Sequence, residues 1–253
     1  MAATIQSLER GLLVLDILGS AEEPLSLNSV AEHFSIDRSS VFRLISTLLK
    51  CGYVTQDSRT KSYSLGYKIL TLSRTLTNHS RVEELVRPIM RHILAMTGQN
   101  THLAVLEGEW VVFLAVERPT DHLALNISVG SREPAVVTAL GKSMLAFQSR
   151  GELDSLLSDH VFKRYTAKSV SSKERLKVEL ERVKKNRLAT DDEEYRSGIM
   201  CFAAPIFDHE NTVRYSIGIS GLKAAIEPKS REYAGIVKQA GFDASDLLLS
   251  RLS

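Results

Sequence analysis

The spacing of apolar residues predicts two short helices joined by a tight turn near the start of the chain. The first helix begins at an N-cap at Ser26 and ends at about Phe34, and its small Ala31 allows a second helix to approach closely. The second helix follows Asp37, which can accept hydrogen bonds from the free amides of its first turn, and ends at Gly52. Its apolar positions follow the spacing i, i+3, i+4, i+7 and are Val41, Leu44, Ile45 and Leu48. This pattern indicates a helix-turn-helix, a structure typical of DNA-binding proteins.

The positions opposite this apolar stripe carry polar and basic side chains. In helix-turn-helix proteins the start of the second helix enters the major groove, where arginine binds a guanine edge and hydroxyls reach bases or phosphates. We therefore predict DNA contacts from Arg38, Ser39, Ser40, Phe42, Arg43 and Thr47. Phe42 has two interpretations: its ring contacts a thymine methyl group or a sugar, or it packs beneath the segment that follows.

That following segment has the pattern of a β-hairpin. Two short β-prone runs, residues 53–56 and 62–65, flank a polar turn. A hairpin directly behind a recognition helix is a wing, and Arg59 and Lys61 at its tip suit contacts with phosphates or the minor groove. A plain charged surface turn is the alternative, but the order of the elements favours the wing.

The distribution of charge agrees with DNA binding, although the total charge does not report on it. The chain has 32 Lys and Arg residues and 30 Asp and Glu residues, a formal net charge of +2. Between Arg38 and Arg74 the basic residues face a single acidic one, Asp57, whereas acidic residues dominate positions 1–37. A domain polarised in this way presents a basic face to phosphates.

The chain is too long for the winged module alone. Its 253 residues, 43% of them hydrophobic, suit a small domain and a larger one. We expect a winged helix-turn-helix domain over residues 1–65, a linker helix over 66–80 and a second domain over 81–253. An apolar seam at helical spacing in the linker packs on its own domain or on a second copy. Because operators are usually read by symmetric dimers, we expect a homodimer.

Several classes of protein are disfavoured by the sequence. No apolar run reaches the length that spans a membrane, and the N-terminal segment lacks the features of a secretion signal. The two cysteines, Cys51 and Cys201, fit neither a metal-binding spacing nor a disulfide framework. We therefore expect a cytoplasmic protein without a metal, a cofactor or a membrane partner.

The second domain alternates helical and strand patterns. Predicted helices cover Arg81 to about Met96, Ala139 to Gln148, Lys173 to Arg187, and a closing segment from about Pro228. Predicted strands cover Thr101 to Leu106, Trp110 to Val116, His122 to Ile127, Met200 to Phe207, and Val213 to Ser220. Hairpins mixed with helices predict an α+β fold with an antiparallel-rich sheet.

One predicted helix opens with small residues, in the segment from Thr138 to Lys142. Exposed amides and the positive end of the helix dipole would suit a carboxylate. The segment Gly-Lys-Ser at Gly141 also resembles the end of a phosphate-binding loop. That motif needs a glycine five residues earlier, where Val136 stands, so the sequence argues against a nucleotide site.

Five segments in this order resemble the IclR family of bacterial transcriptional regulators over nearly the full length of the chain. They are QSLERGLLVLDIL at Gln6, LSLNSVAEHFSIDRSSVFRLISTL at Leu25, GYVTQDSRTKSYSLG at Gly52, VGSREPAVVTALGKSMLAF at Val129 and DDEEYRSGIMCFAAPIFD at Asp191. The resemblance implies a winged helix-turn-helix joined by a linker helix to a small-molecule-sensing domain, assembled on operator DNA as dimers or dimers of dimers. It places the effector pocket at Ala139, Leu140, Asp191, Cys201, Gly218 and Ser220.

Two positions depart from what many relatives carry. Gly218 stands where a hydroxyl is common, and Met200 where an arginine is common. Fewer donors and a more apolar lining predict an aromatic or aliphatic acid as effector, rather than a small hydroxy- or keto-acid. Ordinary structural explanations also exist: Cys201 as core, Asp191 as solvated surface and Ser220 as the end of a strand.

These patterns together predict a ligand-responsive regulator of a catabolic or metabolic operon, with double-stranded operator DNA and a small organic acid as partners. Repressor and activator both remain open. One alternative is an enzyme that uses Cys201 with His102 or His122 as base, but the sequence shows no activating environment for the thiol. The other alternative is a winged-helix module that binds proteins. In the favoured mechanism the effector acts through the linker helices on the paired recognition helices.

Overall fold

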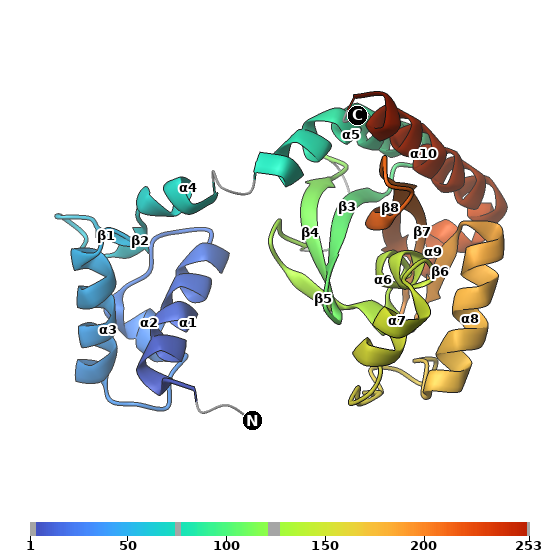
Figure 1. Ribbon diagram of the computed structural model, residues 1–253. Coiled ribbons are helices and arrows are strands. Elements are labelled where there is room, and N and C mark those ends of the chain that lie inside the picture. Colours follow the sequence, from blue (N-terminus) through green and yellow to red (C-terminus); the bar gives the residue numbers. More distant parts are fainter. Residues whose placement is uncertain (1–3, 74–76, 121–126, 252–253) are drawn as a thin grey trace. The chain divides into compact units, whose positions relative to one another are not determined.

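The computed structural model describes residues 4–73, 77–120 and 127–251 (Figure 1). The chain divides into two compact units, the first ending at Thr77 and the second beginning at Asn78. The boundary lies within the predicted linker segment, where helix α4 (Lys68–Ser73) is followed by helix α5 (Thr77–Thr97).

The first unit is a winged helix-turn-helix. It contains helices α1 (Gln6–Ser20), α2 (Leu27–Ala31) and α3 (Arg38–Lys50), followed by a hairpin of β1 (Val54–Gln56) and β2 (Tyr63–Leu65). Its fully or almost fully buried core consists of Val14, Leu18, Val30, Val41, Ile45, Val54 and Tyr63. The core includes two members of the stripe predicted for the second helix, while Leu44 and Leu48 pack against its edge.

The predicted N-caps stand at the starts of α2 and α3. The Ser26 hydroxyl accepts the Ser29 amide at 3.1 Å, and the Asp37 carboxylate accepts the Ser40 amide at 2.9 Å. Gly52, with a φ of 81°, ends the third helix in a conformation that other residues rarely adopt.

The second unit is built on a six-stranded antiparallel sheet in the order β5-β4-β3-β8-β7-β6. The strands are β3 (Asn100–Glu107), β4 (Trp110–Glu117), β5 (Arg132–Pro134), β6 (Ala189–Asp192), β7 (Ile199–Phe207) and β8 (Val213–Leu222). This confirms the predicted α+β fold and the hairpin of β3 and β4. The short strands β5 and β6 were not among the predictions, and the predicted strand at His122 to Ile127 falls mostly on residues 121–126, outside the described residues.

Helices cover both faces of this sheet (Figure 1). On one face, α5 and α10 (Ser230–Arg251) enclose a core that includes Met200, Ala204 and Ile206 of β7. On the other, the 3₁₀ turn η2 (Ala135–Val137), α6 (Ala139–Leu145), α7 (Arg150–Leu156) and α8 (Lys173–Asn186) enclose a core that includes Ala203, with Cys201 packed against it. Alternation along β7 therefore decides which side chains face α6. The short α9 (Lys223–Ile226) and η3 (Glu227–Lys229) lead from β8 into α10.

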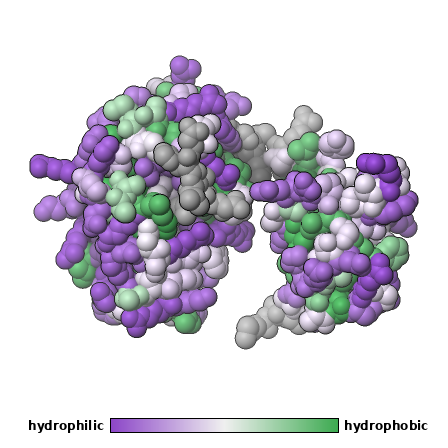
Figure 2. Space-filling model, turned by 180° about the vertical axis from the view of Figure 1, so that it is seen from behind, coloured by the Kyte–Doolittle hydropathy of each residue, from purple (hydrophilic) through white to green (hydrophobic). Residues whose placement is uncertain are grey.

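The surface of the second unit is mostly hydrophilic. Figure 2 shows a face on which hydrophobic side chains form separate spots among charged and polar ones. Within the described residues, no helix is both long enough and apolar enough to cross a membrane.

Candidate functional site

The outer surface of α3 carries the side chains predicted to contact DNA. Arg38, Ser39, Arg43 and Thr47 are exposed and Ser40 is partly exposed. The Phe42 side chain is 49% exposed and is not part of the core of the first unit. Its exposure and its absence from that core argue against the interpretation in which it packs beneath the hairpin, and its contact with DNA stays a prediction. Phe42 lies on the same surface as the basic and hydroxyl side chains.

The start of α3 is organised by Asp37. Its carboxylate accepts hydrogen bonds from the hydroxyls of Ser39 and Ser40, the second at 2.7 Å, as well as from the Ser40 amide. These bonds from Ser39 and Ser40 hold the pKa of the Asp37 carboxyl well below its ordinary value. The Arg43 guanidinium in turn donates to the Ser40 hydroxyl at 3.0 Å. The cap thus orients the first turn and places Arg43 with donors still available for a base edge.

The hairpin behind α3 has the geometry of a wing. At its tip, Asp57 Oδ1 accepts the amides of Arg59 at 3.0 Å and Thr60 at 2.7 Å, so the turn is ordered by its own side chain. A bridge between Leu25 and Tyr63 ties the hairpin to the segment before α2. Arg59 and Lys61 are both exposed on this turn.

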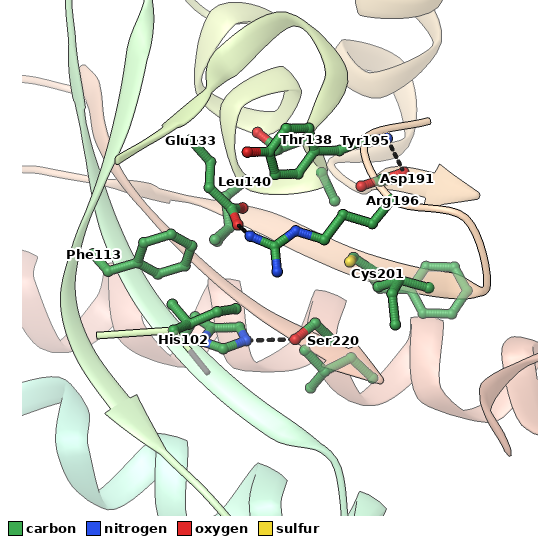
Figure 3. Close-up of a pocket in the computed structure, with 15 residues that line it drawn as sticks. His102, Phe113, Glu133, Thr138, Leu140, Asp191, Tyr195, Arg196, Cys201 and Ser220 are labelled. Carbon is green, nitrogen blue, oxygen red and sulfur yellow. Dashed lines mark hydrogen bonds and ion pairs between the residues drawn. The ribbon is translucent and has the colours of Figure 1, made fainter. Parts of the chain in front are cut away.

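In the second unit, strand register places polar side chains side by side. Asp191 of β6 pairs with Cys201 of β7, and Cys201 pairs with Ser220 of β8. The neighbouring strand β3 adds His102, whose Nε2 lies 2.7 Å from the Ser220 hydroxyl (Figure 3). Four strands thus contribute to one site on the face that α6 covers.

These side chains line a cavity with about 440 Å³ of unoccupied space, its open mouth included. A wall of mostly apolar side chains with a few polar groups is typical of small-molecule sites. The apolar part of its wall consists of Phe113, Ile127, Leu140, Ile199, Phe202 and Ile219. Of the predicted effector residues, the structure brings together Ala139, Leu140, Asp191, Cys201 and Ser220 at this cavity.

Gly218 and Met200 do not line the cavity. A Cβ at Gly218 would lie 2.5 Å from the Phe202 carbonyl oxygen, so this position accommodates the close approach of β7. Met200 is buried in the core beneath α5 and α10, on the other face of the sheet. The reasoning that derived a less polar effector from these two positions is therefore wrong.

The segment from Thr138 to Ser143 has a structural role. The Thr138 hydroxyl accepts the Gly141 amide at 3.3 Å, which uses one of the amides expected to bind a carboxylate. A Cβ at Gly141 would lie 2.2 Å from the Ala135 carbonyl oxygen, so glycine allows α6 to pack on η2. Lys142 is fully buried and forms ion pairs with Glu194 and, at 2.5 Å, with Glu179. Burial opposes its charge, but these two carboxylates outweigh burial and raise the pKa of Lys142.

Asp191 anchors the loop between β6 and β7. It is 3% exposed, which excludes the solvated-surface explanation. Its Oδ1 accepts the amides of Glu194 at 2.7 Å and Tyr195 at 3.4 Å. Burial raises the pKa of Asp191 to about 6 in spite of these hydrogen bonds.

Five polar residues that line the cavity were not among the predicted effector residues: His102, Glu133, Thr138, Tyr195 and Arg196. Arg196 Nη2 lies 3.0 Å from Glu133 Oε1, and burial raises the pKa of Glu133 to about 7. His102 is 2% exposed, and burial lowers the pKa of its imidazole to about 3, so the ring is neutral. Glu133 and Arg196 lie within two of the segments that resemble the IclR family, but nothing in the local sequence shows that they meet.

The chemistry of Cys201 does not suit a nucleophile. Burial, with added repulsion from Asp191 and Glu133, raises the pKa of its thiol well above the ordinary value. An activated cysteine requires the opposite shift. His102 is hydrogen-bonded to Ser220, and His122 lies outside the described residues. The described parts of the chain hold no group of three or more His, Cys, Asp or Glu side chains that could bind a metal ion.

A winged helix-turn-helix joined to an α+β domain whose cavity combines apolar and polar side chains is the architecture of a ligand-responsive DNA-binding transcriptional regulator. Comparison with known families agrees: the profile of the IclR helix-turn-helix domain matches residues 7–58, and that of the bacterial transcriptional regulator IclR C-terminal domain matches residues 74–246. The chain belongs to the IclR family, whose members are regulators and not enzymes.

Individual relatives align over almost the whole chain. The HTH-type transcriptional regulator XynR of Escherichia coli strain K12 is 27% identical over 246 residues, covering 96% of this chain and 97% of XynR. The crystal structure of the Thermotoga maritima IclR is 27% identical, covers 97% of this chain and 100% of that one, and superposes with a TM-score of 0.78. An IclR homologue of Microbacterium hydrocarbonoxydans, crystallised with 4-hydroxybenzoate, has the same fold, with a TM-score of 0.78, 19% identity, and coverage of 97% and 100%.

Proposed function

We propose that this regulator controls a catabolic or metabolic operon, and that it binds operator DNA through α3 and the wing in response to a small carboxylic acid. The domain roles follow the predicted division: residues 1–65 bind DNA, 66–80 link, and 81–253 sense the effector. The observation that carries the proposal is the pairing of an exposed basic helix surface with a cavity whose wall combines apolar side chains and the Arg196 guanidinium.

The DNA-binding part rests on the exposed residues of the first unit. Arg38, Ser39, Ser40, Phe42, Arg43 and Thr47 would contact the major groove. Arg59 and Lys61 on the wing would contact phosphates or the minor groove. Because two half-sites raise the affinity of a weak single site, we propose that the chain acts as a homodimer.

Helix α1 offers a surface for such a dimer. Ile5, Leu8 and Leu12 are 66%, 59% and 53% exposed and follow helical spacing at and just before the start of α1. Contiguous exposed apolar surface is typical of interfaces between proteins. Replacing Leu8 and Leu12 by Glu should shift the sedimentation coefficient towards that of a monomer, whereas a wild-type monomer would contradict the dimer.

The carboxylate part rests on the cavity. Arg196 is the one permanently cationic side chain among the described residues that line it. Guanidinium groups bind carboxylates through paired, charge-assisted hydrogen bonds. The 4-hydroxybenzoate complex of the Microbacterium homologue supports an organic acid as effector, since a protein of the same fold holds one.

The test combines DNA binding with effector titration. The full-length protein is mixed with labelled DNA from the region beside its own gene, and fluorescence anisotropy is followed while aromatic, aliphatic, keto- and sugar acids are added one at a time. We expect salt-sensitive binding that at least one acid weakens or strengthens at saturation. Absence of binding to every tested fragment would contradict the DNA-binding part. Binding that responds only to uncharged compounds would contradict the carboxylate.

A further inference from the structure

The cavity has different chemistry at two places in its wall. Arg196 lies at its mouth, with a side chain that is 44% exposed, while His102 lies deep in the wall and is 2% exposed. Phe113 and Leu140 contribute apolar surface to the same cavity (Figure 3), and Ile219 also lines it. A ligand that fills this space therefore meets a cation, an apolar wall and a neutral polar group.

Arg196 forms an ion pair with Glu133 at the rim of the cavity. Its guanidinium pairs with Glu133 at 3.0 Å and lies 5.1 Å from the centre of the Tyr195 ring. Glu133 has a side chain that is only 13% exposed, so this ion pair connects the loop after β6 with the short strand β5 at the rim of the cavity. A carboxylate that enters the cavity competes with Glu133 for the same guanidinium.

Hydrogen bonds and ion pairs with several neighbouring segments hold the loop that carries Arg196. Asp191 accepts two loop amides, and Glu194 pairs with the buried Lys142. Glu193 accepts the Gly198 amide at 2.9 Å and pairs with Lys168 at 2.6 Å. The Arg196 side chain therefore has the freedom to change partner while its backbone stays in place.

His102, which lines the cavity and is almost fully buried, has one ring nitrogen without a partner in the described part of the chain. His102 Nε2 is engaged with Ser220 at 2.7 Å, and its ring packs edge-on against Phe113 with centroids 5.3 Å apart. The buried Nδ1 of His102 has no hydrogen-bond partner among the described residues. An unpaired buried polar atom of this kind costs stability, and a ligand group that pairs with it recovers that loss.

We propose that Arg196 exchanges Glu133 for the carboxylate of the effector, while the imidazole of His102 hydrogen-bonds a hydroxyl or carbonyl group at the effector's other end. This inference rests on the proposed function and specifies its ligand: a monocarboxylic acid with one neutral polar group across an apolar body. The orientation keeps the charged end at the solvent-facing mouth, where its desolvation costs least.

The first test addresses the carboxylate. Binding of 4-hydroxybenzoate and of its uncharged analogue 4-hydroxybenzamide to the full-length protein is measured by isothermal titration calorimetry. The wild-type protein should prefer the acid, and Arg196→Gln should weaken acid binding by about 10- to 100-fold, the range expected for a lost charge-assisted pair, while amide binding changes less than about threefold. Arg196→Lys should restore part of the preference. Arg182→Gln, on the exposed face of α8, is the matched control.

The second test addresses the hydroxyl. Wild-type protein should bind 4-hydroxybenzoate more tightly than benzoate, and His102→Leu should remove this preference while the acid-over-amide preference remains. Circular dichroism and the melting temperature report whether His102→Leu folds; His102→Gln, which keeps a polar atom, should retain part of the preference and provides a second variant.

The outcomes separate this inference from the proposed function. If the wild type binds the acid and Arg196→Gln binds it equally well, the exchange is wrong and a carboxylate effector stands. Equal wild-type affinity for acid and amide overturns the carboxylate itself. A wild type that binds none of the three probes contradicts a monocarboxylic acid of this shape as ligand, and operator binding by the same preparation still tests the DNA-binding part.

Discussion

The proposed DNA-binding surface and the proposed effector cavity are assembled in opposite ways. Every predicted major-groove contact lies within one helix, between Arg38 and Thr47, and a single capping residue organises its first turn. The cavity instead draws on strands β3 to β8 and on α6, so His102 and Ser220 meet although 118 positions separate them. A surface that contacts a long, regular partner can be read from one helix, whereas a site that encloses a small molecule depends on tertiary structure.

The two regions also differ in whether their cationic side chains have carboxylate partners. On the first unit Arg38, Arg59 and Lys61 are exposed to solvent. In the second unit the cations near the cavity have carboxylate partners: Lys142 with Glu194, and Arg196 with Glu133. Exposed cations suit attraction to a polyanion, and paired ones suit exchange with a single competing anion.

The largest expected effect tests the paired charges. Lys142→Met should lower the free energy of unfolding by about 3–5 kcal/mol, the range for breaking a buried ion pair, because Glu194 is left buried without its cation. Urea denaturation of the full chain, followed in the transition of the second unit, measures this loss.

The control for that variant is Lys177→Met. Lys177 forms a surface ion pair with Asp154 at 2.8 Å, and pairs of this kind contribute at most about 1 kcal/mol. Equal free energies of unfolding for Lys142→Met and the control would show that the buried ion pair stabilises the protein no more than a surface pair. The contrast between paired and exposed cations would then not extend to stability.

The second prediction concerns the recognition helix. Arg43→Ala should weaken operator binding by about 1–3 kcal/mol for each half-site, the range for one base contact, and leave the melting temperature unchanged because Arg43 is exposed. Anisotropy titrations against operator and scrambled DNA measure this loss. Lys50→Ala, at the other end of α3, should have a much smaller effect on the ratio of the two affinities. Intact operator binding by Arg43→Ala would favour a winged-helix module that binds proteins.

Local signals in the sequence were sufficient to predict the helices and the hairpin of the first unit. The caps at Ser26 and Asp37 and the stripe that contains Val41 and Ile45 are short-range features, and each element they predicted is present. Only Phe42 was left undecided, since a single aromatic residue beside a stripe satisfies either pattern.

The cavity was only partly predictable. Ala139, Asp191 and Ser220 were located through resemblance to a family, and strand register explains why Asp191 and Ser220 meet. Glu133 and Arg196 come together through the short strand β5 and a loop, neither of which has an apolar periodicity. Met200 was misassigned because one step along a strand moves a side chain to the opposite face of the sheet.

The third prediction concerns pH and the exchange at Arg196. In the free protein Glu133 faces Arg196 and Asp191, and its pKa is raised to about 7 by burial. When the effector takes Arg196, Glu133 loses its cation, its pKa rises further and it takes up a proton. Affinity for the acid should therefore be highest below pH 7 and fall by up to about tenfold for each pH unit above it.

Calorimetry at pH 6, 7 and 8 in buffers with different ionisation enthalpies measures both the affinity and the number of protons taken up. His102 stays neutral over this range, because burial lowers its pKa to about 3, so it adds no proton of its own. Glu133→Gln should show a weaker dependence on pH than the wild type, because of the two cavity carboxyls only Asp191, whose pKa burial raises to about 6, still titrates near this range. A wild type whose affinity is constant across the range would contradict the exchange of partners.

The smallest expected effect concerns the wing. Replacing both Arg59 and Lys61 by Ala should weaken binding to operator and scrambled DNA by the same few-fold factor at moderate salt. Each phosphate contact that is lost should reduce the slope of log affinity against log salt by about 1. The hairpin should remain folded, because its turn is held by Asp57 and not by the two basic side chains. If the double variant instead changed the preference for operator over scrambled DNA, the wing would read sequence in the minor groove, and recognition would extend beyond α3.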